Sequence, residues 1–239
     1  MLASTAVMGL LAWVVVQFVL PAAEASRRSA CTSHLKFIGL AMSNYHDIYG
    51  CFPQAYVAGP DGKPWHSWRV LLLPYLSHKD IFQRYKFDEP WDGPNNRRLE
   101  NSLRNDIGSP VFHCPSDPAS GRERTNYLLI TGPGTMFEAD HTPKRREIRD
   151  GDYNTIMVVE VARSGIQWME PRDLVFDEMD FKVNGVPGKS ISSLHPMGAL
   201  LIRADGSVHF LNNSTSERAI RALITIDGGD HADLPANDP

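Results

Sequence analysis

An apolar segment occupies the first twenty residues of the chain. Residues 1–20 contain no charged side chain, and Gln17 is the only strongly polar group among them. At 1.5 Å per residue, a helix of that length spans roughly 30 Å, the thickness of the hydrocarbon core of a bilayer. The pattern therefore predicts a membrane-spanning helix, and we assign residues 1–25 to an anchor.

The helical pattern continues beyond Pro21. Apolar residues recur at intervals of four, three, four, three and four, at Cys31, Leu35, Ile38, Met42, Tyr45 and Tyr49. This spacing places them on one face of a helix, and Gly50 is typical of a position where a helix ends. We expect one long helix whose first half lies in lipid and whose second half packs against a folded domain.

A cleaved signal peptide is the alternative interpretation of this N-terminus. Ala23-Glu24-Ala25 fits the small-x-small pattern of a cleavage site. The segment lacks a basic beginning, however, and its apolar run exceeds the usual length, so we prefer a retained anchor. Charge counting leaves the orientation open, because Arg27 and Arg28 follow the segment and alone would place the domain in the cytoplasm.

The rest of the chain predicts one α+β domain, residues 26–230, and a disordered tail, 231–239. Its clearest part is a pair of strands at 199–203 and 207–211, because Asp205-Gly206 between them is the strongest short hairpin signal. A final helix is expected at 215–226, capped by Asn213 or Ser214. Further helices are expected at 68–73, 75–85 and 95–105, and further strands at 111–114, 126–131, 155–161 and 166–170.

Composition and charge narrow the function. The 239 residues carry a formal net charge of −4, so no basic surface invites nucleic acid. No nucleophile elbow, phosphate loop or His-Glu-x-x-His motif occurs in the sequence, so we expect neither an enzyme nor a cofactor. Cys-x-x-Cys and paired Cys/His spacings do not occur either, which argues against structural zinc.

Short motifs along the chain resemble one family. They are residues 31–41, Asn44-Tyr45-His46-Asp47, Phe52-Pro53, Ser67-Trp68-Arg69, Pro74-Tyr75-Leu76, Glu89-Pro90-Trp91-Asp92, Cys114-Pro115-Ser116-Asp117, Gly132-Pro133-Gly134-Thr135 and Glu170-Pro171-Arg172-Asp173. The family's best-known mark is a histidine, nine residues and then Asp-Gly; here it is His195 with Asp205-Gly206. Over nearly its whole length, the chain resembles the type IV pilin-like family called domain of unknown function 1559.

The resemblance implies a pilin-like fold, with a long N-terminal helix packed on an antiparallel β-sheet and a C-terminal hairpin and helix. It also implies a prepilin-type N-terminus cut by a prepilin peptidase, and a body on the periplasmic side of the inner membrane. The sequence departs from the family there, because it lacks the basic leader, the glycine and the Phe-Thr-Leu-Ile-Glu motif. Either the start is truncated or this member keeps an uncleaved anchor.

We therefore expect a single-pass, pseudopilin-like structural protein of the inner membrane, with its C-terminal domain in the periplasm. Such a protein fits a type II secretion or type IV pilus-like assembly. The small residues Ala3, Ala6, Gly9 and Ala12 would let its helix pair in lipid with a second copy or another pilin-like subunit. The alternative is a periplasmic solute- or partner-binding module that uses the sheet face or the loop at residues 132–150.

The candidate site residues are the family signature and the cysteines. An extended chain between His195 and Asp205 separates them by up to about 30 Å, which argues against joint chelation of one ion. We expect Asp205-Gly206 to make the turn and His195 to anchor the loop before the hairpin; the alternative is that each contacts a separate partner. Three cysteines allow at most one disulfide within the chain.

The pairing of those cysteines is open. Cys31 and Cys114 are a candidate disulfide that would tie the helix to the sheet, and an oxidising periplasm would permit it. Cys51 competes for Cys114, and reduced, buried thiols are the third alternative. Glu160 lies inside an apolar strand, where an outward-facing or hydrogen-bonded side chain is more common than a catalytic acid.

Overall fold

The computed structural model describes Met8, Trp13 and residues 15–103, 110–138 and 141–229. The predicted tail, 231–239, lies outside the described residues. So do residues 1–7, 9–12 and 14 of the predicted anchor, which include Ala3, Ala6, Gly9 and Ala12.

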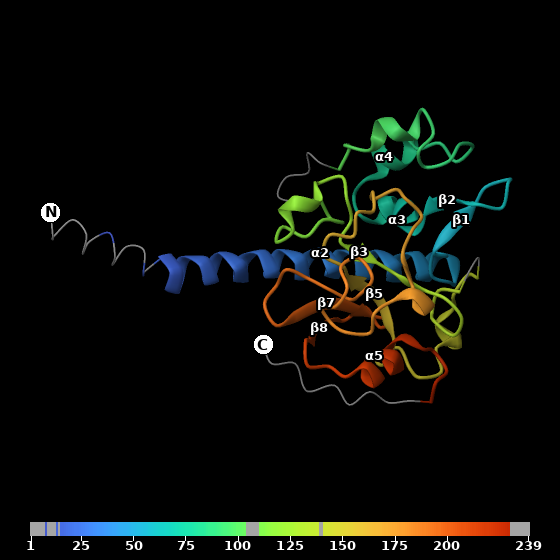
Figure 1. Cartoon of the computed structure of the whole chain (residues 1–239). Coiled ribbons are helices and arrows are strands. Elements are labelled where there is room, and N and C mark those ends of the chain that lie inside the picture. The colour runs from blue at the N-terminus through green and yellow to red at the C-terminus, as the bar shows by residue number, and fades with distance from the viewer. Residues whose placement is uncertain (1–7, 9–12, 14, 104–109, 139–140, 230–239) are drawn as a thin grey trace.

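One long helix runs through the molecule (Figure 1). A π-helical segment, η1 (Val15–Val19), leads directly into α2 (Leu20–Tyr49). Pro21 does not interrupt the helix because it occupies its first turn, where no backbone donor is needed. The helix ends at Gly50, as predicted: its φ is 70°, and its N–H donates to the carbonyl of His46 at 2.8 Å.

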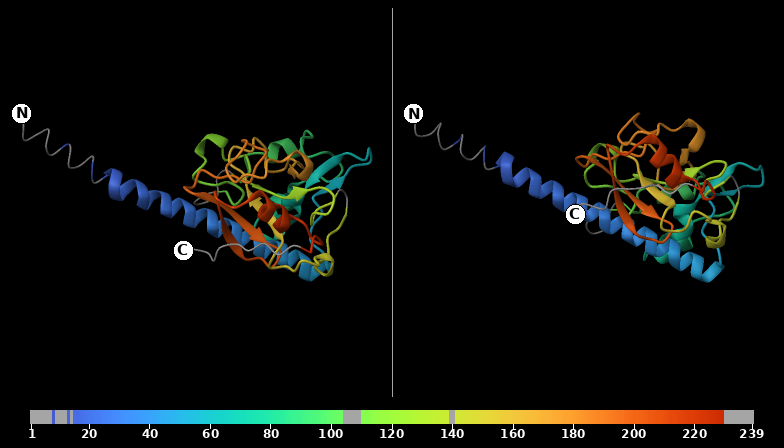
Figure 2. Two further views of the ribbon diagram at one scale, coloured as in Figure 1. Left: turned by 60° about the horizontal axis from the view of Figure 1, so that its bottom comes forward. Right: turned by 90° about the horizontal axis from the view of Figure 1, so that it is seen from below.

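The second half of α2 is embedded in the body. The predicted apolar face is confirmed for Cys31, Leu35, Ile38 and Met42, which are all fully buried. Tyr45 packs at the edge of the core, whereas Tyr49 is 59% exposed, because the body no longer covers the helix near its end. Beyond the other end of the body, the beginning of the helix projects away from it in each view of Figure 2.

A four-stranded antiparallel sheet packs against α2. Its strands lie in the order β3 (Tyr127–Leu128), β5 (Ile156–Glu160), β7 (Gly198–Arg203) and β8 (Val208–Asn212). Strands β7 and β8 form the predicted hairpin, with Ile202 opposite Val208. Alternate residues of β7 enter two cores: Leu200 and Ile202 face the core that includes α2, and Ala199 and Leu201 face the other.

Helix α5 (Glu217–Ile224) covers the second face of the sheet. It begins after Ser216, whose hydroxyl accepts a hydrogen bond from Ala219 N–H, and not at Asn213 or Ser214 as predicted. The architecture is therefore mixed α+β, as predicted, with the sheet between α2 and α5 (Figure 1).

Shorter elements complete the body. They are β1 (Tyr56–Ala58), β2 (Pro64–Ser67), α3 (Trp68–Leu72), η2 (Leu73–Tyr75), α4 (Lys79–Arg84), η3 (Asn96–Leu99), η4 (Pro118–Ser120), β4 (Ile130–Thr131), η5 (Arg145–Glu147), β6 (Leu174–Val175) and η6 (Phe176–Glu178). Strands β1 and β2 pair antiparallel, and β4 and β6 pair in parallel. Ser67 caps α3, its side chain accepting a hydrogen bond from Arg69 N–H.

Several short elements differ from the prediction. The predicted strand at 111–114 does not form; residues 110–113 make a turn instead, closed by the hydrogen bond from His113 N–H to the Pro110 carbonyl. The predicted strand at 166–170 is reduced to a single bridge between Gln167 and Arg124. The predicted helix at 75–85 begins only at Lys79, because Ser77 has a φ of 65°, which a helix does not accommodate.

Within the part of the chain that the structure describes, no helix combines the length and the apolar character needed to cross a membrane.

Candidate functional site

The signature residues lie at opposite ends of β7. His195 precedes the strand, and Asp205 and Gly206 form the turn that follows it. The side chain of Asp205 accepts hydrogen bonds from the N–H and the hydroxyl of Ser207, and Gly206 has a φ of 87°. Six extended residues span about 20 Å, and the structure does not bring His195 and Asp205 together.

Both ends of the signature nevertheless contact helix α2. The turn packs so closely that a Cβ atom on Gly39 would lie 3.0 Å from the carbonyl oxygen of Gly206. His195 contacts the same helix at Glu24. Glu24 and Gly39 are fifteen residues apart, or about 22 Å along a helix. The hairpin and the loop before it thus contact α2 at two positions along the helix.

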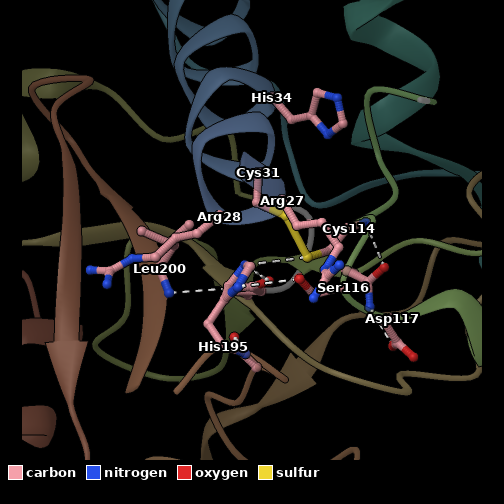
Figure 3. Close-up of a disulfide and its surroundings, with 12 residues drawn as sticks. Arg27, Arg28, Cys31, His34, Cys114, Ser116, Asp117, His195 and Leu200 are labelled. Carbon is pink, nitrogen blue, oxygen red and sulfur yellow. Dashed lines mark hydrogen bonds and ion pairs between the residues drawn. A yellow bond between two sulfur atoms is a disulfide. The ribbon is translucent and has the colours of Figure 1, made fainter. Parts of the chain in front are cut away.

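His195 is the centre of a buried polar cluster (Figure 3). Its side chain is fully buried, and its Nδ1 atom lies 2.5 Å from Glu24 Oε1. Its Nε2 atom lies 3.5 Å from Cys114 Sγ and 3.6 Å from Glu160 Oε1. Because a carboxylate can only accept, Nδ1 carries the proton, which leaves the Nε2 lone pair directed at Cys114 and Glu160.

A disulfide joins Cys31 of α2 to Cys114 beside this histidine (Figure 3). The Cα atoms are 5.4 Å apart, and the bond closes a loop with a sequence separation of 83. Of the alternatives left open by the sequence, the structure therefore forms the one between Cys31 and Cys114, and Cys51 remains a free thiol. Ser116 donates a further hydrogen bond to Glu24, at 3.1 Å.

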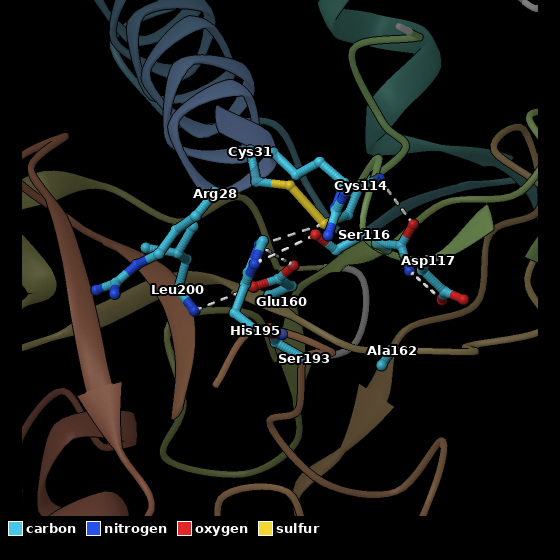
Figure 4. A network of polar contacts seen from close by, with 12 residues as sticks. Arg28, Cys31, Cys114, Ser116, Asp117, Glu160, Ala162, Ser193, His195 and Leu200 are labelled. Atoms are coloured by element: carbon cyan, nitrogen blue, oxygen red, sulfur yellow. Dashed lines mark hydrogen bonds and ion pairs between the residues drawn. A yellow bond between two sulfur atoms is a disulfide. The ribbon is translucent and has the colours of Figure 1, made fainter. Parts of the chain in front are cut away.

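The buried cluster also contains Glu160, which lies in the central strand β5 (Figure 4). Its side chain is only 1% exposed, so it is hydrogen-bonded and not outward-facing: Oε2 accepts from Leu200 N–H at 3.1 Å. Burial, with the nearby charges of Asp117 and Glu24, raises the pKa of Glu160 to about 8. This carboxyl is therefore mainly protonated at neutral pH.

The charges of Glu24 and His195 are set by each other and by burial. Burial acts to raise the pKa of Glu24, but hydrogen bonds from His195, Arg27 and Ser116 outweigh it, and the pKa is lowered. Burial lowers the pKa of His195, and the hydrogen bond with Glu24 opposes that effect. The neutral imidazole is thereby favoured in a site where a charge would be poorly solvated.

Four side chains of this cluster are of the types that ligate metals: Cys31, Cys114, Glu160 and His195. One ligand atom from each lies within 4.8 Å of the others. All four residues are buried in the folded protein. The chemistry open to this arrangement is thiol–disulfide exchange and metal ligation.

A second buried polar centre joins two of the family motifs. Arg69 is fully buried, and its guanidinium lies 2.6 Å from Asp173 Oδ1. It also donates to the carbonyl of Tyr127, while Asp173 accepts from the N–H of Leu129 and the indole of Trp68. Ser67-Trp68-Arg69 and Glu170-Pro171-Arg172-Asp173 therefore meet in space although about a hundred residues separate them.

Sequence reasoning missed the roles of Glu24 and Ser116. Glu24 had appeared only as the middle of a cleavage pattern. A usable signal was present, because Glu24 precedes Cys31 by seven residues, two helical turns, and so extends the buried face of α2. No comparable signal links Ser116 to His195, because 79 residues separate them.

The fold and the site together define a class of protein: an α+β domain built on one long N-terminal helix and locked to it by a buried disulfide. The chain belongs to the family described as "Protein of unknown function (DUF1559)", whose model matches residues 21–143. The match includes Glu24, Cys31 and Cys114; the signature at His195 and Asp205 lies outside it. No curated protein and no solved structure matches the chain.

Proposed function

We propose that this protein is a pseudopilin-like structural protein, anchored in the inner membrane by a single N-terminal helix and carrying its domain in the periplasm. We further propose that it is a subunit of a type II secretion or type IV pilus-like assembly. The observation that carries the proposal is the division of the long helix into an embedded half and a projecting, apolar beginning.

The projecting part of the helix exposes large apolar side chains. Val16, Phe18, Val19 and Leu20 are between 52% and 61% exposed, and Trp13 is 54% exposed. Apolar surface of this kind gains about 25 cal/mol for every Å² removed from water, and contiguous patches of it mark protein or membrane contacts. Lipid, or the equivalent helix of another subunit, would supply the missing contacts.

Glu24 supports a helix that is retained and not cleaved. Cleavage after Ala25 would remove Glu24, the residue that contacts both His195 and Ser116. It would leave His195 buried without its carboxylate partner, at a cost of about 1–3 kcal/mol for the unsatisfied group. A continuous helix through Ala23-Glu24-Ala25 avoids that cost.

The pilin-like part of the proposal is supported by the architecture. A long N-terminal helix lies with its buried face on an antiparallel sheet, and the chain ends in a hairpin and a helix. The family resemblance adds the assembly role, which is the part of the proposal that an experiment must decide.

Membrane attachment is tested with the full chain expressed in a bacterium that has two membranes. Carbonate-washed membranes should retain the protein, and protease added to spheroplasts should digest its C-terminal domain. The double variant Phe18→Arg/Leu20→Arg should move at least half of the protein to the soluble fraction. The matched control, Ser29→Arg/Ser33→Arg, places the same charges at exposed positions of the embedded half and should behave as wild type.

Equal recovery of both variants in the membrane would contradict the anchor. A mature protein that begins after Ala25 would contradict it as well, and N-terminal sequencing of the purified chain measures this directly.

A binding module is the second candidate, and one observation favours it. A cavity of about 710 Å³ lies between α2 and residues 75–78, lined in part by Phe37, Leu40, Tyr75 and Leu76. Its volume is within the range of small-molecule sites. The sheet faces are covered by α2 and α5, so this groove is the better location for a ligand. A melting temperature that rises with one compound of a solute panel, in a protein that stays monomeric, would favour this candidate.

A further inference from the structure

We propose that reduction of the buried disulfide opens a zinc site whose four ligands are Cys31, Cys114, His195 and Glu160. The inference concerns the joint between α2 and the body, so it stands or falls independently of membrane attachment.

The distances from His195 to Cys114 and to Glu160 match those of a metal site. Zinc bonds of about 2.0–2.3 Å in a tetrahedron place the ligand atoms roughly 3.3–3.8 Å apart. His195 Nε2 lies 3.5 Å from Cys114 Sγ and 3.6 Å from Glu160 Oε1, and all four ligand atoms lie within 4.8 Å of one another. To bind zinc, the two sulfur atoms must move apart after reduction, and the atom pairs that are up to 4.8 Å apart must close by about 1 Å.

The orientation of His195 is the one that zinc requires. Metal-bound histidines almost always donate their second ring N–H to a carboxylate or carbonyl, which fixes the tautomer and the ring. Glu24 Oε1 lies 2.5 Å from Nδ1 and takes this role. Nε2 is directed at Cys114 Sγ and Glu160 Oε1 (Figure 4). Glu24 is thus a positioning residue and not a ligand.

The donor set and its burial favour zinc over other ions. Two thiolates, an imidazole and a carboxylate in tetrahedral positions suit Zn²⁺, whereas calcium and magnesium prefer oxygen ligands. The four ligand residues are at most 2% exposed. Four protein ligands in a closed environment are typical of structural zinc. The ion would replace the disulfide as the link between α2 and the sheet.

The chemical steps balance with a dithiol as reductant. One thiolate of the reductant attacks a sulfur of the disulfide, the S–S bond breaks, and its electron pair goes to the other cysteine. The second thiolate of the reductant then attacks the reductant's own sulfur in this mixed disulfide and expels the cysteine as a thiolate, giving two reduced cysteines and the oxidised, disulfide form of the reductant. Zn²⁺ replaces both thiol protons and any proton on Glu160, and these protons pass to solvent.

The test uses the full chain in detergent, under anaerobic conditions, in oxidised and reduced forms. A water-soluble phosphine reduces the disulfide with one water molecule, yielding two thiols and the phosphine oxide. After incubation with Zn²⁺ and desalting, elemental analysis should find about one zinc per reduced chain and none per oxidised chain. Co²⁺ in place of zinc should give thiolate-to-cobalt charge transfer and the intense d–d bands of a tetrahedral site.

The rate of cysteine alkylation in the reduced wild-type protein shows which cysteines bind zinc, without any substitution. Zinc should slow the modification of Cys31 and Cys114 at least tenfold, and it should leave the rate at Cys51 unchanged. Equal zinc content in the oxidised and reduced forms would overturn the proposal, as would unprotected Cys31 and Cys114 in the presence of zinc.

Two substitutions separate ligation from positioning while the disulfide form reports correct folding. Glu24→Gln should weaken zinc binding by about 10–100-fold, the usual effect of losing such a partner. Glu160→Gln should weaken it at least as much and change the cobalt d–d spectrum, and Cys51→Ser should bind as wild type. Unchanged affinity in Glu24→Gln would overturn the positioning role, and unchanged affinity in Glu160→Gln would overturn the fourth ligand.

Discussion

The buried pair of Arg69 and Asp173 illustrates how single residues organise this domain. A charge away from water is tolerated only when it is paired and hydrogen-bonded. Burial lowers the pKa of Arg69 and raises that of Asp173, and each charge opposes the shift of the other. The pair therefore holds α3 against the segment before β6, because separating the two would leave a buried charge unpaired.

Arg69→Met should destabilise the domain by about 3–5 kcal/mol, because it leaves Asp173 buried without its partner. Urea unfolding of the detergent-solubilised chain, followed by tryptophan fluorescence, measures the change. The double variant Arg69→Met/Asp173→Leu should lose less than the sum of the single variants, since no unpaired charge remains. Arg172→Met is the control: Arg172 is a neighbouring arginine with a 57% exposed side chain that pairs with Glu170, and it should cost at most about 1 kcal/mol.

His66 provides a dependence of stability on pH. It is 2% exposed, and its Nδ1 atom lies 2.9 Å from the hydroxyl of Tyr85. Burial lowers the pKa of His66, and a hydrogen bond with the backbone of Phe87 partly offsets this effect. The unfolded chain, with a histidine pKa of about 6.5, therefore binds the proton more readily than the folded one. This contribution to the free energy of unfolding is present above about pH 6.5 and is lost as the pH falls through the lowered folded pKa.

Comparing wild type with His66→Gln isolates that contribution, because His34 and His113, whose pKa values burial also lowers, remain in both proteins. The free energy of unfolding should fall less in the variant than in wild type between about pH 7.5 and pH 5.5. Identical pH profiles from urea titrations would show that protonation of His66 does not destabilise the folded protein.

At the scale of secondary structure, periodicity predicted the elements whose stabilising contacts lie close together in the sequence. The buried face of α2, its end at Gly50 and the β7–β8 hairpin are local patterns of apolar spacing and turn residues. The strand expected at 126–131 is present but divides into β3 and β4, which pair with β5 and β6, respectively. The two-residue strand β6 has no such pattern: it forms because Leu174 pairs with the distant Ile130, and a pairing over that separation leaves no trace in a short window of sequence.

The candidate site was predictable only in part for the same reason. Cys31 and Cys114 were named as one of several pairings, and His195 was expected to anchor the loop before the hairpin. That Glu24 would meet His195 depends on the folding of a chain in which the two are 171 positions apart. Asp205 and Gly206 formed the expected turn from local chemistry alone, and their contact with Gly39 again required the folded molecule.

The disulfide between Cys31 and Cys114 should be the principal covalent restraint on α2. Replacing both cysteines by serine should lower the free energy of unfolding by about 2–5 kcal/mol, because the unfolded chain loses the restraint of a long closed loop. Urea unfolding without reductant measures this. Cys51→Ser removes the free thiol outside the site and should change stability by no more than about 0.5 kcal/mol. Equal stability of the two variants would contradict the restraint.

For the whole molecule, the decisive property is a helix that is packed in the core of the body at one end and exposes apolar side chains at the other. If the projecting parts of neighbouring copies pair, Phe18→Cys in a Cys51→Ser background should form disulfide-linked dimers under mild oxidation in membranes. The yield should rise with expression level, because pairing is concentration-dependent. Tyr153→Cys in the same background is the control, since Tyr153 is 63% exposed on the body. Equal dimer yields, read on non-reducing gels, would exclude pairing through the helix.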